Sequence, residues 1–184
     1  MANKVKYGLK NVYYATVTVG TNSVSYGTPV AWPGAVSLSL DAEGDTNDFY
    51  ADNVKYFTAI ANNGYSGDFE SALIPETFKT DIMGEVAGTG AKSGMIYEDA
   101  TVQPKAFALM FQFEGDANAT RHVLYNCKMT RPSIEGATTE DGIEVQTETG
   151  EITAAPRAFD SIVKASCAST AATAYTNWFT AVQE

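Results

Sequence analysis

The chain has 184 residues, of which 45% are hydrophobic and only 18% are charged, and its formal net charge is −10. This acidity argues against tight direct binding of DNA or RNA, because such binding uses clustered Lys and Arg to neutralise phosphates. No apolar run approaches the ~20 residues that a membrane-spanning helix needs, so no membrane partner is expected. We expect one domain, made in a cytoplasm: the N-terminal residues lack the apolar core of a signal peptide, and Cys127 and Cys167 lie outside any CxxC pattern.

Alternating polar and apolar residues predict short strands in the first part of the chain. Residues 1–11 are polar and basic without an apolar period, so we expect an N-terminal arm. The first strands are expected at residues 11–19, 24–26 and 35–40. In the last of these, Val36, Leu38 and Leu40 are expected on a buried face, with small polar residues opposite.

A segment rich in Asp, Asn and Gly, residues 41–53, is expected to form a loop. Phe49 and Tyr50 near its end would be a liability if they were exposed on a monomer. The loop is therefore either a solvated tip or a segment that wraps onto a neighbour. Beyond it, Asn62-Asn63-Gly64 predicts a tight hairpin turn because these residues tolerate positive φ. The strands of that hairpin would be residues 54–61 and 65–72.

Residues 75–83 are expected to form the one flanking helix. Pro75 suits the first helical position, Phe78 and Ile82 share a face, and Gly84 suits the left-handed residue that ends a helix. A helix this short is not stable alone, so it should cover a sheet and bury Phe78 and Ile82.

The rest of the chain continues the strand pattern. Strands are expected at residues 95–97, 105–114, 120–130, 143–154 and 159–166, and residues 171–184 are expected to form a C-terminal arm or short helix. In the strongest strand Phe107, Leu109 and Phe111 share one face with Phe113. The sum predicts a mainly β chain, a β-sandwich or barrel-like domain with a flanking helix.

No catalytic, cofactor or metal site is expected. His122 stands at a polar strand position, and a single histidine with two distant cysteines does not make a zinc site. Nucleotide-binding glycine motifs are absent. Asp68 with Glu70, and Glu144 with Glu148, would each project from one strand face, but such pairs are more often solvated surfaces than acid–base couples. Enzymatic activity is therefore not expected.

Six segments stand in order between about residue 4 and about residue 170: KYGLKNVYYA, PGAVSLSL, FYADNVKYF, NNGYSGDFE, IPETFKTDIMG and KAFALMFQFEG. Together they resemble the major tail (tube) proteins of long-tailed bacteriophages that infect Gram-positive hosts. The resemblance implies a β-sandwich whose copies form hexameric rings, and rings that stack into a tail tube for genome delivery. Its partners in the virion would be the tape measure, tail terminator and distal tail proteins, with DNA in transient passage.

The resemblance also implies which residues meet other subunits. The long loop, residues 41–56, and the terminal regions would reach onto neighbouring subunits or rings. The interface candidates are Asp41, Asp45, Asp48, Phe49, Tyr50, Asp52, Asn53, Tyr56, Trp178 and Phe179. An acidic tube wall would repel phosphates, so that DNA slides without binding. The lumen-facing candidates are Asp68, Glu70, Glu144 and Glu148.

Two other classes of function stay open at this point. One is a monomeric carbohydrate-binding β-sandwich on a phage or cell surface, which needs a concave aromatic face. Its candidate residues are Tyr13, Tyr14, Trp32, Tyr56 and Tyr65. The other is an enzyme that uses two carboxylates in a deep cleft, one of them with a raised pKa.

Overall fold

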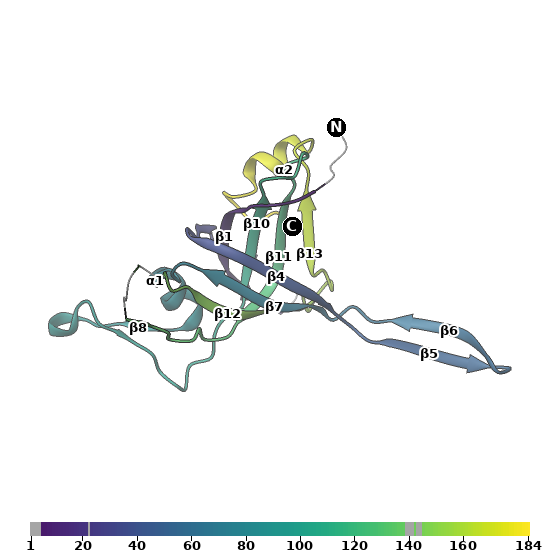
Figure 1. Ribbon diagram of the computed structural model, residues 1–184, viewed down its shortest axis with the longest axis horizontal. Helices are drawn as coiled ribbons and strands as arrows, with labels where there is room; N and C mark the ends of the chain where they lie inside the picture. The colour runs from purple at the N-terminus through teal and green to yellow at the C-terminus, as the bar shows by residue number, and fades with distance from the viewer. Residues whose placement is uncertain (1–4, 22, 139–141, 143–144) are drawn as a thin grey trace.

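The computed structural model describes residues 5–21, 23–138, 142 and 145–184, and the fold is mainly β (Figure 1). The strands of its main sheet are β1 (Leu9–Val19), β2 (Val24–Tyr26), β3 (Val30–Ala31), β4 (Ala35–Glu43), β7 (Gly64–Ser71), β10 (Phe107–Phe113), β11 (Arg121–Met129), β12 (Glu148–Ala154) and β13 (Lys164–Cys167). They pair in the order β2-β1-β10-β11-β12-β7-β4, while β3 joins β1 and β13 joins β11. Every pair is antiparallel, and the predicted β-sandwich-like class is confirmed.

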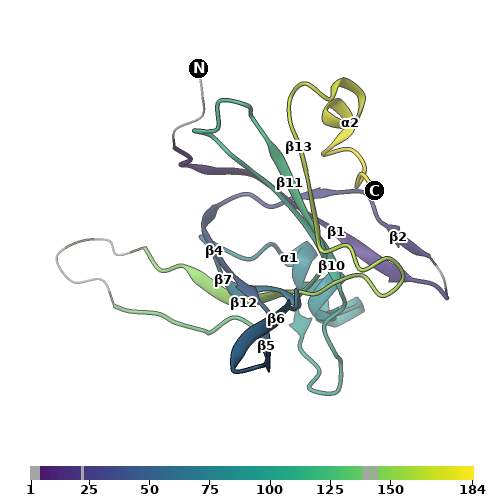
Figure 2. The same cartoon turned by 90° about the vertical axis from the view of Figure 1, so that its right-hand side faces the viewer.

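The sheet folds over on itself at β11. The first half of β11 pairs with β13, from Arg121 to Leu124, whereas its end pairs with β12, from Cys127 to Met129. The strands β1, β10, β11 and β13 therefore form one layer, and β12, β7 and β4 cross it as the other (Figure 2). Between the layers lies a core whose largest fully buried side chains include Phe69, Phe107 and Ile152.

A short helix closes this core, as the sequence predicts. It consists of α1 (Glu76–Phe78) and the π-helix η1 (Lys79–Met83), and Pro75 stands directly before it. Phe78 and Ile82 are completely buried. Gly84 ends the helix in the left-handed conformation, with φ of 78°. The Phe78 ring meets the rings of Tyr14 and Phe107 edge-on, at centroid distances of 5.0 and 5.1 Å, which is a favoured aromatic geometry.

The C-terminal segment packs on the outer face of its own sheet. Helix α2 (Ala172–Asn177) leads to Trp178, which is only 3% exposed, and to Phe179, whose ring stacks on Tyr13 at 4.6 Å. The expected short helix is confirmed, but Trp178 is not on an arm free to meet a neighbour. The reason is that β10 is buried on both faces, so Ala108 and Met110 need a cover of their own.

The segment after β4 is a strand rather than the expected loop. Strands β5 (Thr46–Ala51) and β6 (Val54–Ile60) pair with each other and continue the β4–β7 pair as one long two-stranded ribbon. The Ala61 N–H donates to the Asp45 carbonyl and the Asn63 N–H to the Glu43 carbonyl, so the pairing bridges the joint. The ribbon turns at Asp52-Asn53, where φ is +53° and +62°, as a two-residue hairpin turn requires.

The hairpin predicted at Asn62-Asn63-Gly64 is therefore wrong, because β6 does not pair with β7. Gly64 is needed for a different reason, its close approach to β12. A Cβ at Gly64 would lie 1.9 Å from the carbonyl oxygen of Ala154 in β12, so only glycine allows the ribbon to pass this close. Positive φ thus occurs both at the turn of the ribbon, Asp52-Asn53, and at Gly64, where the ribbon passes β12.

Smaller corrections concern faces and ends. A register shift between Ala35 and Ser37 leaves Val36 50% exposed, while Leu38 and Leu40 pack against the core as expected. Three strands begin elsewhere than predicted: β12 begins at Glu148 rather than at residue 143, β13 begins at Lys164 rather than at residue 159, and β1 begins at Leu9, inside the expected arm, rather than at residue 11. The N-terminal part of the expected arm, residues 1–4, lies outside the described residues. A small satellite sheet pairs β8 (Val86–Ala87) with β9 (Ile96–Tyr97), linked through the 3-10 helix η2 (Gly90–Lys92).

Candidate functional site

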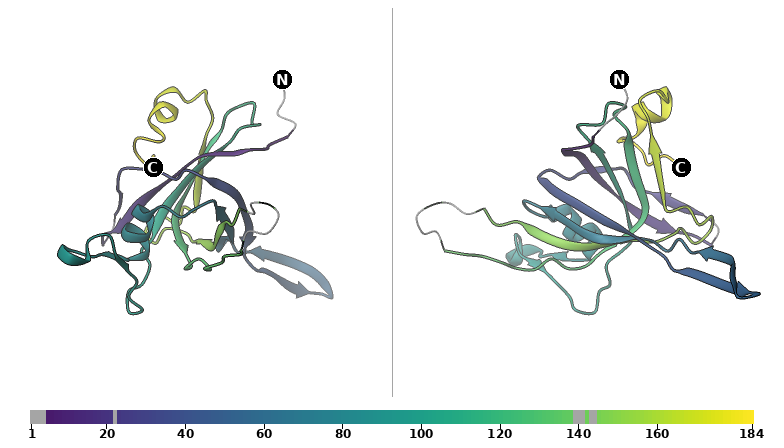
Figure 3. Two further views of the ribbon diagram at one scale, coloured as in Figure 1. Left: turned by 60° about the vertical axis from the view of Figure 1, so that its left-hand side comes forward. Right: turned by 45° about the vertical axis from the view of Figure 1, so that its right-hand side comes forward.

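The β5–β6 hairpin projects from the body of the molecule (Figures 1 and 3). Its strands pair only with each other within the described chain. At a rise of about 3.4 Å per residue, the 7 residues of β6 extend roughly 24 Å. An isolated two-stranded hairpin is marginally stable at best in water. The projection therefore needs a surface to pack on.

The hairpin has one largely apolar face and one mixed face. Phe49 lies opposite Phe57, and alternation places Ala51, Val54 and Ala59 on the same side. A register shift beside Phe49 brings in Tyr56, whose ring meets the Phe49 ring at 6.5 Å. We call these six residues the hairpin apolar face. Phe49 and Phe57 are 60% and 61% exposed, so no described part of the chain covers this face.

On the opposite side of the hairpin, an ion pair and a hydrogen bond link the two strands. Asp48 accepts a hydrogen bond from the Thr58 hydroxyl at 2.8 Å and pairs with Lys55, also at 2.8 Å. These contacts fix the register of the hairpin and point away from the apolar face. The same side also carries Tyr50 and Ile60, which are 64% and 80% exposed, so uncovered apolar groups stand on both sides of the hairpin and are concentrated around Phe49 and Phe57.

The structure brings eight of the predicted interface residues onto this ribbon. Asp41 lies in β4, Asp45 at the joint, and the others in β5, the turn or β6; all are exposed: Asp41, Asp45, Asp48, Phe49, Tyr50, Asp52, Asn53 and Tyr56. The sequence reasoning missed Phe57, which is equally exposed. Its signal becomes visible once Asp52-Asn53 is taken as the turn, because Phe57 then pairs with Phe49.

A second surface stands out on the solvent side of β4, β7 and β12. Carboxylates and small hydroxyls alternate across it, and we call it the acidic sheet face; its members are Ser37, Ser39, Asp41, Glu43, Ser66, Asp68, Glu70, Thr149, Glu151 and Thr153. Asp68 stands directly opposite Glu151, an arrangement of like charges that costs stability. Glu70 accepts hydrogen bonds from Ser37 at 3.0 Å and Thr147 at 2.7 Å. None of the ion pairs found between described residues neutralises this face.

Glu148 does not share this surface. It follows the alternation of the inner face, where its carboxylate accepts a hydrogen bond from the Ile74 N–H and lies 3.7 Å from the Lys79 ammonium. Glu148 therefore anchors the helix entrance, and Glu151, which the sequence reasoning missed, stands beside Asp68 instead. Glu144 lies outside the described residues.

The aromatic residues that a sugar-binding platform would need are dispersed. Tyr14 and Trp32 are in the core, where the Trp32 indole N–H donates to the Ser71 hydroxyl at 2.9 Å. Tyr13 is stacked under the C-terminal segment, Tyr56 is on the hairpin, and Tyr65 is in β7 beside the Lys164 ammonium. The predicted aromatic set thus forms no common concave face.

The remaining reactive side chains are held by packing. His122 stacks on Phe111 at 5.2 Å, and its half-burial lowers its pKa. Burial raises the pKa of the Cys127 thiol to about 12. Over the described ranges we find no grouping of three His, Cys, Asp or Glu side chains suited to a metal ion. Nor does that part of the chain contain a helix with the length and apolarity to cross a bilayer.

No protein-family model matches the chain, and a search of curated proteins finds no match. The case for a function therefore rests on the two surfaces, the hairpin apolar face and the acidic sheet face.

Proposed function

We propose that the protein is a structural subunit that assembles with copies of itself into hexameric rings, and that the rings stack into a phage tail tube. The observation that carries the proposal is the hairpin apolar face. It presents two phenyl rings on a hairpin that is too small to be stable by itself and that lies far from any layer of its own chain. A second copy supplies the missing cover.

The sheet also supports lateral contact between copies. β4 is the last strand of its layer and, among the described residues, pairs only with β7, so one of its edges offers backbone N–H and C=O groups for pairing with another chain. Edges of this kind are normally protected, because they pair readily with other chains. A ring uses them instead: edge-to-edge pairing around a closed circle leaves no free edge.

The acidic sheet face suits the wall of a conduit for DNA. Its five carboxylates have no cationic partner among the described residues, and they belong to one rigid sheet. A wall of this charge repels phosphates and keeps the genome from sticking. The chain would be made in the host cytoplasm and carried in the virion, with the tape measure, tail terminator and distal tail proteins as partners.

A concentration series tests the assembly proposal. Purified protein is examined by negative-stain electron microscopy and sedimentation from micromolar to millimolar concentration. Rings or tubes above a threshold are expected for the wild type, and dispersed monomer for Phe57→Asp. A wild type that stays monomeric throughout would contradict the proposal and favour a monomeric binding module.

The lumen assignment has a separate test in a phage that carries the variant protein. Neutralising Asp68, Glu70 and Glu151 to the amides is expected to slow genome ejection while tubes still form. A control neutralises three carboxylates away from this face, at Glu76, Glu114 and Glu135. Ejection kinetics equal to those of the control would contradict the proposal that the acidic sheet face keeps DNA from sticking to the tube wall.

A further inference from the structure

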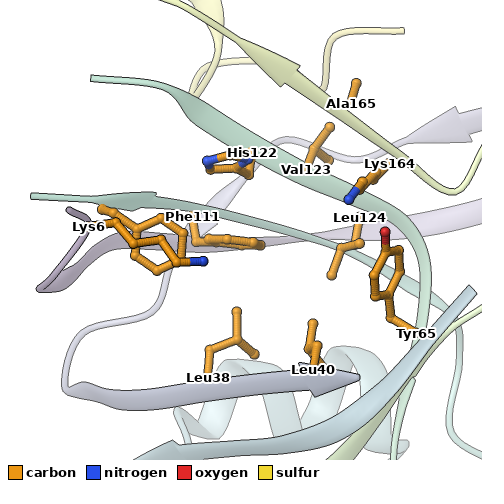
Figure 4. A pocket seen from close by; sticks show the side chains of 11 residues that line it. Lys6, Leu38, Leu40, Tyr65, Phe111, His122, Val123, Leu124, Lys164 and Ala165 are labelled. Atoms are coloured by element: carbon orange, nitrogen blue, oxygen red, sulfur yellow. The ribbon is translucent and has the colours of Figure 1, made fainter. Parts of the chain in front are cut away.

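The two layers of the sandwich do not close at one end, and a groove opens between them (Figure 4). Its volume is about 230 Å³, and we call it the end groove. It is lined by side chains from β4, β7, β10, β11, β13 and the N-terminal segment: Lys6, Leu38, Leu40, Tyr65, Phe111, Phe113, His122, Val123, Leu124, Lys164 and Ala165. The lining is mainly apolar, with His122, the Tyr65 phenol and two lysines as its polar groups, and it includes no carboxylate.

The two lysines lie over aromatic rings at the rim of the groove. The Lys6 ammonium lies 4.9 Å from the centre of the Phe113 ring, and the Lys164 ammonium lies 4.6 Å from that of Tyr65. Such cation–π contacts position a charge without neutralising it. Neither lysine has a carboxylate partner among the described residues. The end groove thus presents an apolar floor beneath two uncompensated positive charges.

Size and shape select the kind of occupant. The groove is smaller than the 300–1,000 Å³ of usual small-molecule sites. Leu38 and Leu40, on its floor, are only partly buried. A cavity of this kind accepts one or two protruding side chains from a larger partner. The complementary partner carries exposed aromatic rings next to carboxylates.

The chain itself carries that complement. The hairpin apolar face offers Phe49, Tyr56 and Phe57, and Asp52 at the adjoining turn has no cationic partner among the described residues. We propose that the end groove receives the β5–β6 hairpin of a second copy of this chain, with an aromatic ring on Leu38 and Leu40 and Asp52 of the hairpin turn beside one of the rim lysines. The inference rests on the proposed function, for which it supplies the acceptor site.

The contact has to be between molecules. β4 forms one wall of the groove and continues into β5, so the ribbon leads the hairpin away from the groove of its own chain. Donor and acceptor are different surfaces of the same chain, which makes the contact heterologous. Contacts of this type repeat without limit unless they close, as the stacking of rings requires.

Two variants separate donor from acceptor. Phe57→Asp disables the hairpin and keeps the groove, while Lys6→Glu with Lys164→Glu disables the groove and keeps the hairpin. Circular dichroism and thermal unfolding check that both fold. Each alone is expected to sediment as a monomer, with an assembly threshold raised at least about tenfold. Mixed one to one, they are expected to form a complex, because an intact hairpin then meets an intact groove.

A matched control reverses two lysines outside the groove, Lys105 and Lys128, and is expected to assemble like the wild type. If the wild type assembles and the mixture stays monomeric, the acceptor assignment is overturned while the tube proposal stands. A wild type that never assembles overturns both. Decanoate serves as a probe for a small carboxylate ligand; tight binding in the groove without any effect on assembly would also overturn the inference.

Discussion

The two halves of the ribbon, β4–β7 and β5–β6, differ in the burial of their phenylalanine side chains. In the β4–β7 half, Phe69 is completely buried and its ring meets Trp32 edge-on at 4.9 Å. In the β5–β6 half, Phe49 and Phe57 have the same strand alternation but stand in solvent. Backbone hydrogen bonds bridge the joint between the halves, and the halves differ in what lies beneath them. Alternation specifies that a strand has an apolar face, and the rest of the chain decides whether that face is core or contact surface.

The largest effect expected from this contrast is at Phe69. Phe69→Ala removes a fully buried ring from between Trp32 and the core and should lower the free energy of unfolding by about 3–5 kcal/mol. Urea unfolding of the monomer measures it. Phe69→Leu, which refills part of the volume, should lose clearly less. A loss below about 1 kcal/mol for the alanine variant would contradict the role of this half as core.

A smaller effect is expected at the helix entrance. Glu148→Ala leaves the buried Ile74 N–H without its acceptor and breaks the Lys79 pair, so about 1–3 kcal/mol should be lost. The matched control is Glu151→Ala on the acidic sheet face, where the change should stay within about ±0.5 kcal/mol. Equal losses of unfolding free energy in the two variants would contradict the anchoring role of Glu148.

Acid should weaken the fold through His122, whose burial holds its pKa below the usual value. Lys6 and Lys164 lower this pKa further, and Asp116 opposes them. The unfolded chain therefore takes up the proton first, and stability falls as the pH drops through about 6.5 towards the folded pKa. Unfolding free energies at pH 7.5 and 5.5 measure this loss, which His122→Gln should reduce. An undiminished loss in the variant would assign it to other groups.

The smallest effect on folding is expected on the hairpin. Phe57→Ala should change the free energy of unfolding of the monomer by no more than about 0.5 kcal/mol, because the side chain already lies in water. The same variant should fail to assemble. Chemical denaturation at low concentration and sedimentation at high concentration make the two measurements. A destabilised monomer would mean that the hairpin belongs to the fold rather than to an interface.

Local sequence patterns predict much of the fold correctly. Phe107, Leu109 and Phe111 share a face, and the helix over residues 75–83 ends at Gly84, because neighbours along the chain decide both. The ribbon was harder. Asp52-Asn53 and Asn62-Asn63-Gly64 both tolerate positive φ, and the choice between them depends on the close passage of Gly64 by β12.

The candidate site divides in the same way. Exposed aromatics on an acidic segment were visible in the sequence, as were Asp68 and Glu70 on one face. The position of Glu148 depends on its hydrogen bond from Ile74, and that of Trp178 on the apolar outer face of β10, so neither follows from local pattern. Contacts between distant segments decided these residues.

The most direct test of the central claim is hydrogen exchange of the hairpin amides in dilute monomer and in the assembled state. If a second copy covers the hairpin apolar face, amides of residues 46–60 should exchange fast in the monomer and become strongly protected on assembly. Amides of the β4–β7 pair should be slow in both states. Fast exchange across residues 46–60 in the assembled state would contradict the account.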